Sequence, residues 1–201
     1  MGQLARKEDE HFTYGDYLSW NDDERWELID GVPYDMSPAP RVAHQRILGN
    51  LHYQLFPWFI DKPCQLFLAP FDVRLPEADE ADERVATVVQ PDLLVVCDPG
   101  KLDQAGCRGA PDLIIEILSP GTAHKDLKIK FDLYERAGVR EYWIVDPAER
   151  TVMLFTGDGD GRYGRPQVYG DHDRVRVSIF PGVEVALAPL FAEPVAQVGR
   201  S

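Results

Sequence analysis

The spacing of apolar residues predicts two helices. Residues 41–60 carry apolar side chains at helical intervals, and Pro63 ends the segment. The positions that set this rhythm are Val42, Ile47, Leu48, Leu51, Leu55 and Phe59. A second helix is predicted over residues 123–137, with Thr122 as its N-cap and Gly138 as its C-cap.

Four apolar runs predict the strands of a sheet. They cover residues 65–75, 85–97, 111–118 and 141–145. Pro70 and Pro91 interrupt the first two runs, which favours an edge or a bulge at those points. The third run is apolar on both faces, so we expect it to be a central strand.

Shorter β-rich segments flank this core. Near the start, a short helix over residues 16–20 and a hairpin turning at Asp30-Gly31 are expected. Near the end, strands are expected at 151–156, 167–169, 175–179 and 183–185. The whole predicts an α/β (α+β) fold with a mixed central sheet flanked by helices and β extensions at both ends. We expect tails at 1–10 and 193–201 around one domain over 11–192.

Composition excludes several classes of protein. No segment of the 201 residues is a long enough apolar run to cross a bilayer, and the first residues lack the apolar stretch of a secretory signal. The three cysteines are far apart and odd in number, which argues against a disulfide framework and a zinc knuckle. We therefore expect a cytoplasmic protein with no membrane partner.

The formal net charge of −13 argues against strong non-specific binding to nucleic acid. A local basic patch is still compatible with that total. Clustered carboxylates are also what a divalent-metal site requires. The charge therefore restricts nucleic-acid contacts to a limited region of the surface.

Two carboxylates stand out because of their apolar surroundings. Glu116 lies between Ile115 and Ile117, where a charge is costly unless it is paired, protonated or metal-bound. Asp92 precedes another apolar run. Alone, Glu116 fits a buried salt bridge and Asp92 a turn cap. Together, on paired strands, the two acids would meet at one sheet end and suit Mg²⁺ or Mn²⁺.

A phosphodiester site also needs a cation, and Lys130 and Lys128 compete for that role. On an α-helical wheel, Lys130 falls nearer the inward face that Leu127 and Tyr134 define, whereas Lys128 falls on the polar side. Asp112, which repeats the Pro-Asp pattern of Asp92, would lie roughly 13 Å from Glu116 along the strand, too far to share an ion.

Three further residues are secondary candidates. Glu27 lies between Trp26 and Leu28 and could add an acid to the site, although an exposed strand position fits equally well. His44 could bind or orient a phosphate, or be structural. Ser119, directly after the third apolar run, could contact substrate or simply form the turn. The glycine-rich segment 157–164 is interpreted as a hairpin turn, because it lacks the last acid of a calcium loop.

The segments WELIDG, VVQPDLLVV and APDLIIEILSPGTAHKDLKIKFDLYERAGVREYWIVD resemble the Uma-type family within the PD-(D/E)XK nuclease superfamily. The resemblance covers about residues 14–190. It implies a restriction-endonuclease-like fold, with Asp92 and Glu116 as the acids of the motif. The motif lysine two residues after the acid is replaced by Leu118, and the resemblance implies that Lys130 supplies it from the next helix.

Two hypotheses follow. The first is a Mg²⁺- or Mn²⁺-dependent endonuclease that hydrolyses DNA phosphodiester bonds, with Asp92 and Glu116 as metal ligands and Lys130 as the catalytic cation. A homodimer would suit the cutting of two strands. The second is a catalytically impaired nuclease fold that acts as a binding or regulatory module, as the displaced lysine and the net charge would allow.

Overall fold

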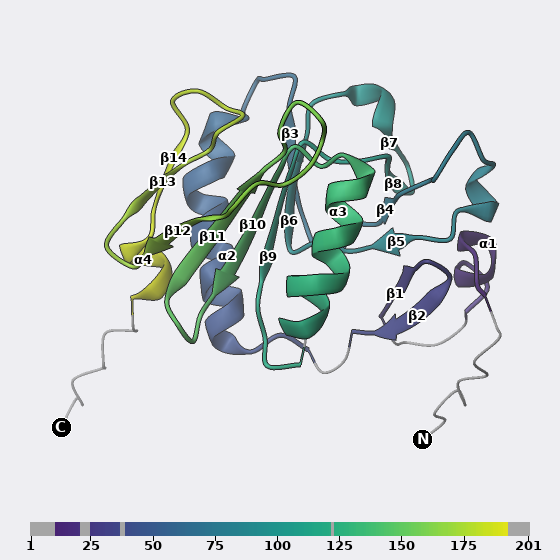
Figure 1. The fold of residues 1–201 in the computed structure, drawn as a ribbon, viewed down its shortest axis with the longest axis horizontal. Coiled ribbons are helices and arrows are strands. Elements are labelled where there is room, and N and C mark those ends of the chain that lie inside the picture. The colour runs from purple at the N-terminus through teal and green to yellow at the C-terminus, as the bar shows by residue number, and fades with distance from the viewer. Residues whose placement is uncertain (1–10, 21–24, 37–38, 122, 193–201) are drawn as a thin grey trace.

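The computed structural model describes residues 11–20, 25–36, 39–121 and 123–192. The tails predicted at 1–10 and 193–201, and the N-cap expected at Thr122, lie outside these ranges. The single domain over 11–192 stays a prediction. The described elements form two six-stranded sheets, a small two-stranded sheet and a few helices (Figure 1).

A mixed sheet forms the centre of the molecule. Its strands, in spatial order, are β12 (Gln167–Gly170), β11 (Thr151–Thr156), β10 (Glu141–Asp146), β9 (Leu113–Ile117), β6 (Leu93–Val96) and β3 (Gln65–Leu68). β9 pairs in parallel with β10 and antiparallel with β6. All five residues of β9 are buried, which confirms the central strand predicted from its apolar character.

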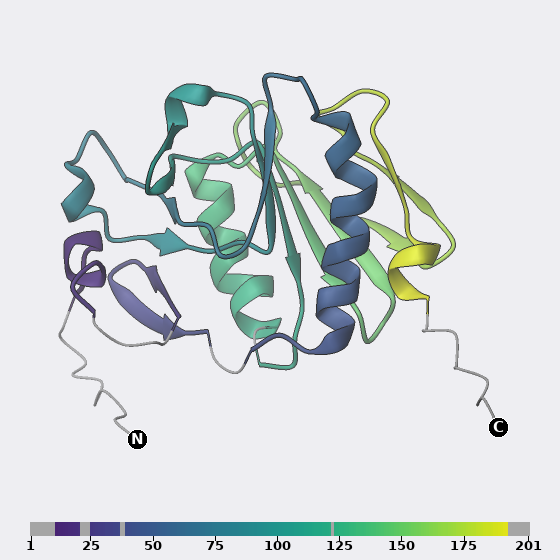
Figure 2. The same cartoon turned by 180° about the vertical axis from the view of Figure 1, so that it is seen from behind.

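Helices cover both faces of this sheet, as Figures 1 and 2 show. On one face lie α2 (Val42–Leu55), the pair β13 (Arg174–Arg176) and β14 (Glu184–Ala186), and α4 (Ala188–Phe191). On the other lies a π-helical segment, η4 (Lys125–Lys130), continued by α3 (Phe131–Ala137). Alternate residues of β9 face opposite ways: Ile115 packs with α2 and Ile114 with α3. Glu116 therefore lies on the α3 face.

A second sheet packs beside the first. Its strands are β2 (Val32–Asp35), β1 (Trp26–Ile29), β5 (Val88–Val89), β4 (Val73–Arg74), β8 (Gly106–Arg108) and β7 (Leu102–Asp103). Short helices accompany it or its connections, namely α1 (Tyr14–Tyr17), η2 (Asp82–Arg84) and η3 (Pro99–Lys101).

Two predicted strands are each divided between the sheets. The run 65–75 forms β3 and then β4, and the run 85–97 forms β5 and then β6. The breaks contain Pro70 and Pro91, because proline has no N–H to donate to a ladder. Asp92 therefore lies where the chain crosses from the second sheet into the central one.

Both predicted helices also differ from expectation. The first ends as an α-helix at Leu55 and continues only as η1 (Phe56–Trp58), so it stops well before Pro63. The second is π-helical from Lys125 to Lys130, which turns its side chains away from α-helical positions. Leu127, placed on the inward face by the wheel, is 44% exposed for this reason.

The expectation of no disulfide is wrong for one pair of cysteines. Gln65 pairs with Val96 in the β3–β6 ladder, which brings the next residues out, Cys64 and Cys97, opposite each other. They form a disulfide, and Cys107 is a buried free thiol. The sequence separation of 33 residues hid this proximity, because only strand pairing creates it.

Thiol titration tests this bond. In denaturant without reductant, the protein should show one reactive thiol, that of Cys107, and all three after reduction. Native Cys107 should react slowly, because burial raises the pKa of its thiol to about 11 and little thiolate is present. A Cys107→Ala variant should show no thiol before reduction. Three thiols in the unreduced protein would refute the pairing.

Candidate active site

Asp92 and Glu116 lie side by side at one end of the central sheet. Leu93 of β6 pairs with Ile115 of β9, so Asp92 and Glu116 follow as the next opposed pair. The backbone N–H of Asp92 lies 3.4 Å from Glu116 Oε2, and the N–H of Ile117 donates to Asp92 Oδ2 at 2.8 Å. The antiparallel ladder thus brings together two acids that are far apart in the sequence.

Lys130 reaches the same point from the end of η4. Its Nζ lies 2.7 Å from Glu116 Oε1 and 2.7 Å from Glu27 Oε1, and the residue is 2% exposed. Lys128 is exposed. The α-helical wheel that favoured Lys130 does not describe a π-helical segment, so the ion pairs, and not the wheel, explain its inward position.

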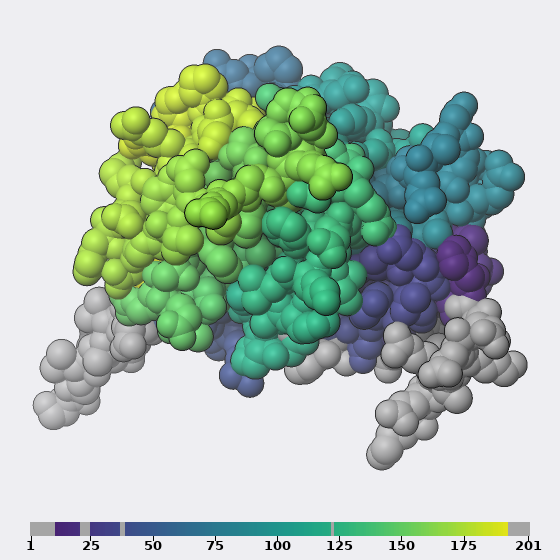
Figure 3. All heavy atoms as spheres, viewed as in Figure 1, coloured from purple at the N-terminus to yellow at the C-terminus, as the bar shows by residue number. Residues whose placement is uncertain are grey.

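Glu27 belongs to the cluster and is not an exposed strand residue. It is fully buried in β1, where Oε1 accepts a hydrogen bond from the Gln90 N–H at 2.9 Å and Oε2 binds Lys125 Nζ at 2.6 Å. Figure 3 shows the β1–β2 hairpin directly against the surface of the helical segment that carries the lysines. A residue of the second sheet thus completes a site on the first.

The sequence did not predict a chemical role for three further polar groups of the cluster. Tyr134 was placed inward only as an apolar side chain, yet its hydroxyl donates to Glu116 Oε1 at 2.8 Å. Asp126 is buried 3.7 Å from Lys130 Nζ, and Lys125 holds Glu27. The i, i+4 spacing of Asp126 and Lys130 was the available sequence signal.

The other candidates are placed differently. His44 is buried, its Nε2 lies 3.1 Å from Asp92 Oδ2, and its Nδ1 has no hydrogen-bond partner among the described residues. Ser119 lies in the turn after β9, where its carbonyl accepts the N–H of Ala123 at 3.1 Å. Asp112 lies at the opposite end of β9, where it accepts the Cys97 N–H at 2.8 Å. It takes no part in the cluster, in agreement with the distance argument.

The two glutamates that share Lys130 differ in pKa. Burial opposes the charge of each, but Glu27 has two lysines beside it, which lower its pKa to about 2. Burial raises the pKa of Glu116 to about 8, since Lys130 only partly offsets it and the acids Asp126, Asp92 and Glu27 add to the rise. Burial opposes the charge of Lys130, but Glu116, Glu27 and Asp126 hold its pKa well above the ordinary value. Such contrasts are typical of functional sites, although buried ion pairs also produce them.

The donor set suits a hard, partly hydrated cation. Among the described ranges, no group of three or more His, Cys, Asp or Glu side chains is arranged to hold a metal ion. Two neighbouring carboxylates nevertheless offer the oxygen ligands that Mg²⁺ takes along with waters and substrate phosphates. Among the described residues, Glu116 Oε2 makes the long contact with the Asp92 N–H, whereas Oε1 is occupied by Lys130 and Tyr134. The residues therefore fit a Mg²⁺-type ion.

Comparison with known proteins identifies the family. Residues 14–188 match Uma2, a family described as "Putative restriction endonuclease". The chain belongs to the Uma2 family. This confirms the resemblance drawn from the sequence, and membership indicates a nuclease. No curated protein matches the chain.

One solved structure supports the fold. It is described as a "putative nuclease belonging to DUF820 from Anabaena variabilis", and it superposes with a TM-score of 0.67 at 19% identity. The match covers 90% of this chain and 97% of that one. The expected nuclease-type α+β architecture is thereby confirmed. In the described ranges, no helix is both long and apolar enough to span a membrane.

The charge of Glu27 should stabilise the fold in a pH-dependent way. Its pKa falls from 4.5 to about 2 on folding, so its stabilisation is complete above pH 4.5 and is lost as the pH falls toward 2. Glu27→Gln should lower the free energy of unfolding by about 3 kcal/mol at neutral pH. The difference from wild type should shrink across that acid range.

Denaturant unfolding in chelator, followed across pH, measures this difference. Glu149→Gln, at an exposed turn position, is the matched control and should change little. An equal loss of stability at pH 2 and pH 7 would show that the charge of Glu27 does not stabilise the fold.

Proposed function

We propose that the chain is an endonuclease that hydrolyses DNA phosphodiester bonds with Mg²⁺ or Mn²⁺. The observation that carries the proposal is the meeting of Asp92 and Glu116 at one sheet end, with Lys130 Nζ 2.7 Å from Glu116. Two carboxylates can hold a divalent ion, and a lysine beside them can stabilise charge that develops on a phosphate. Family membership supports the same reaction class.

Asp92 and Glu116 would hold the ion. When bound, such a cation lowers the pKa of a water and neutralises charge that develops on the phosphate. His44 Nε2 and the Ile117 N–H fix one oxygen of Asp92, which limits the rotation of that carboxylate. Tyr134 and Lys130 fix one oxygen of Glu116 in the same way. The acids are thus oriented before substrate arrives.

Lys130 would keep its positive charge next to the reacting phosphate. Leu118, two residues after Glu116, is buried and apolar, and it cannot supply an ammonium. The ammonium of Lys130 stands beside the same carboxylate, supplied from η4. Glu27 holds it from the other side, so its position does not depend on substrate. Lys125, on the same segment, is less deeply buried and pairs only with Glu27 in the described cluster.

A binding or regulatory module is the second candidate. It is favoured by the close pairing of Lys130 with carboxylates and by the net charge of −13. Calorimetry separates the two readings, because an enzyme of the proposed kind must bind Mg²⁺ or Mn²⁺ at millimolar levels. A homodimer, which the cutting of two strands would favour, stays a prediction.

Removing either acid should abolish cleavage. Asp92→Asn and Glu116→Gln should each lower Mg²⁺- or Mn²⁺-dependent cleavage of plasmid and linear DNA by more than roughly 100-fold, because each loses a charged metal ligand. Asp112→Asn, which changes the same Pro-Asp pattern at the other sheet end, should keep most of the activity. Wild-type activity in Asp92→Asn would refute the assignment.

Lys130 and Lys128 give a matched pair of variants that tests the proposed catalytic cation. Lys130→Met should lower the cleavage rate by roughly 100-fold, because it removes the only ammonium within reach of Glu116 among the described contacts. Lys128→Met, on the exposed side of the same segment, should cleave like wild type. Circular dichroism of both variants checks that they fold. Equal rates in the two variants would remove Lys130 from the mechanism.

A further inference from the structure

A cleft of about 420 Å³ opens between the first turns of α2, the β10–β11 turn and α4. Arg46 and Arg150 supply its charge, and Ile47, Pro147, Leu190 and Phe191 also line it, three of them as buried core residues. Its volume lies within the range of roughly 300–1,000 Å³ that is usual for small-ligand sites. Nothing in the mechanism above uses these residues.

The cleft lies at the same end of the central sheet as Asp92 and Glu116. On α2, Arg46 comes two residues after His44, whose ring contacts Asp92. On the other side, Ile144 of β10 pairs with Glu116, and Pro147 follows directly after that strand ends. The cleft lies on the α2 face of the sheet and Glu116 on the α3 face, and Pro147 is three residues, roughly 10 Å, beyond the partner of Glu116. A nucleic-acid strand that crosses the acid pair would have to continue roughly 10 Å or more around this end of the sheet to reach it.

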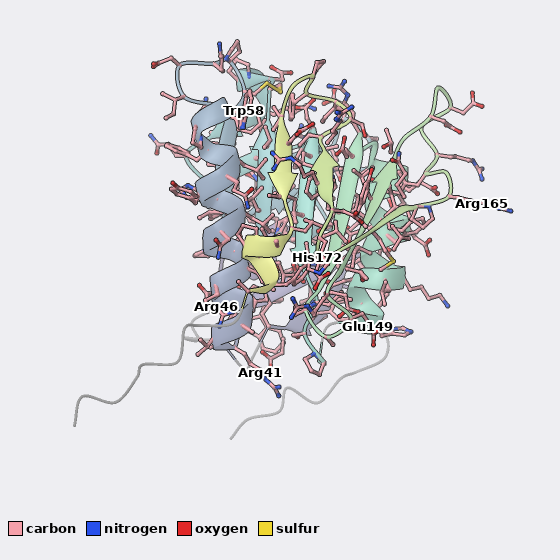
Figure 4. All side chains as sticks on the ribbon, turned by 90° about the vertical axis from the view of Figure 1, so that its left-hand side faces the viewer. Arg41, Arg46, Trp58, Glu149, Arg165 and His172 are labelled. Atoms are coloured by element: carbon pink, nitrogen blue, oxygen red, sulfur yellow. A yellow bond between two sulfur atoms is a disulfide. The ribbon has the colours of Figure 1, made fainter. Side chains whose placement is uncertain are left out.

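The positive charge at the N-terminal end of α2 favours the binding of phosphate. The first turn of α2 contains no acid, and its N-cap residue, Arg41, makes no side-chain capping bond, so the positive end of the helix is not neutralised by its own residues. Figure 4 shows Arg41 and Arg46 at the same end of the molecule. Because the chain has a net charge of −13, a local group of positive charges would attract a phosphate to this end of the sheet and not to the rest of the surface.

Both cleft arginines have partners that a phosphate could join or replace. Arg150 is exposed and pairs with Asp171 at 2.8 Å, and Arg46 donates to the carbonyl of Ala192. The guanidinium group has five donors, so neither contact exhausts it. Arg150 also has a φ of 55°, where glycine or asparagine would be less strained. An arginine at this strained position is explained if its side chain has a function that glycine or asparagine could not supply.

We propose that this cleft binds a nucleic-acid strand beside the phosphate to be cut. Arg46 and Arg150 hold one backbone phosphate of that strand. This proposal rests on the proposed function for the position of the phosphate that is cut. Binding of the strand can nevertheless be measured without cleavage. A duplex would enter with one strand in the cleft.

Three variants test the cleft. They are Arg46→Gln, which keeps helix propensity, Arg150→Asn, which suits the positive φ, and the double variant. Fluorescence anisotropy in chelator measures the binding of labelled single-stranded and duplex oligonucleotides over a salt series. Each single change should weaken binding about tenfold. The slope of log K against log salt should fall by about 1 for each change.

The matched control is Arg165→Gln, at an exposed arginine that Figure 4 shows far from Arg46. It should bind like wild type. Wild-type affinity and salt slope in the double variant would overturn the proposal, and so would failure of the wild-type chain to bind either oligonucleotide. The proposal would also be overturned if, in the double variant, inorganic phosphate no longer competed with the oligonucleotide while the oligonucleotide affinity was unchanged. The cleft would then be a free-anion site.

A small substrate separates this proposal from the proposed function. Hydrolysis of bis(p-nitrophenyl) phosphate with Mg²⁺ or Mn²⁺ requires the acid pair, but the compound does not extend to the phosphate position between Arg46 and Arg150. The double variant should hydrolyse it at the wild-type rate. If wild type hydrolyses neither this compound nor DNA, yet the cleft variants lose oligonucleotide affinity, the nuclease assignment fails and the binding site stands.

Discussion

A single buried ammonium group joins the parts of this molecule that carry its chemistry. Lys130 Nζ lies 2.7 Å from Glu27 in the second sheet and 2.7 Å from Glu116 in the central sheet. Each of these charges would be costly to bury alone, at several kcal/mol per ion after relaxation. Paired, they hold the β1–β2 hairpin, η4 and β9 to one geometry. Removing one partner would leave the others uncompensated, so the cluster is both a structural tie and a candidate catalytic centre.

The local backbone around this cluster departs from regular structure where the side chains require it. Asp92 stands at the crossing between the two sheets, one residue after Pro91, and so lies outside a ladder while its carboxylate accepts the Ile117 N–H. Lys125, Asp126 and Lys130 all lie on the π-helical segment. π-Helical turns are rare and occur frequently at functional sites, because the extra residue per turn redirects side chains. Here the widened turn is where both lysines reach Glu27.

The same charges explain why the acids behave differently. Glu27 has two lysines and a backbone N–H as partners, so its charge is stabilised. Burial raises the pKa of Glu116 first, Lys130 offsets this only in part, and the neighbouring acids raise it further, so its charge is disfavoured. A carboxylate that resists ionisation among other acids is a suitable ligand for a divalent ion, whose charge would offset theirs. The disfavoured charge of Glu116 therefore links the fold to the proposed chemistry.

The sequence by itself determined the central strand around Glu116, the hairpin at Asp30-Gly31, the mixed α+β class and the family. These depend on local apolar spacing, turn residues and motif, which are readable along the chain. It also pointed to Glu116 because a lone acid between isoleucines needs a partner. Only the tertiary structure decided what those partners are. The transfer of two strand runs to a second sheet, the π-helical turn, the Cys64–Cys97 bond and the burial of Glu27 beside Lys125 and Lys130 depend on contacts between distant segments. Apolar spacing reports whether a side chain is buried, but not which charge it meets there, because that is set by how whole elements pack.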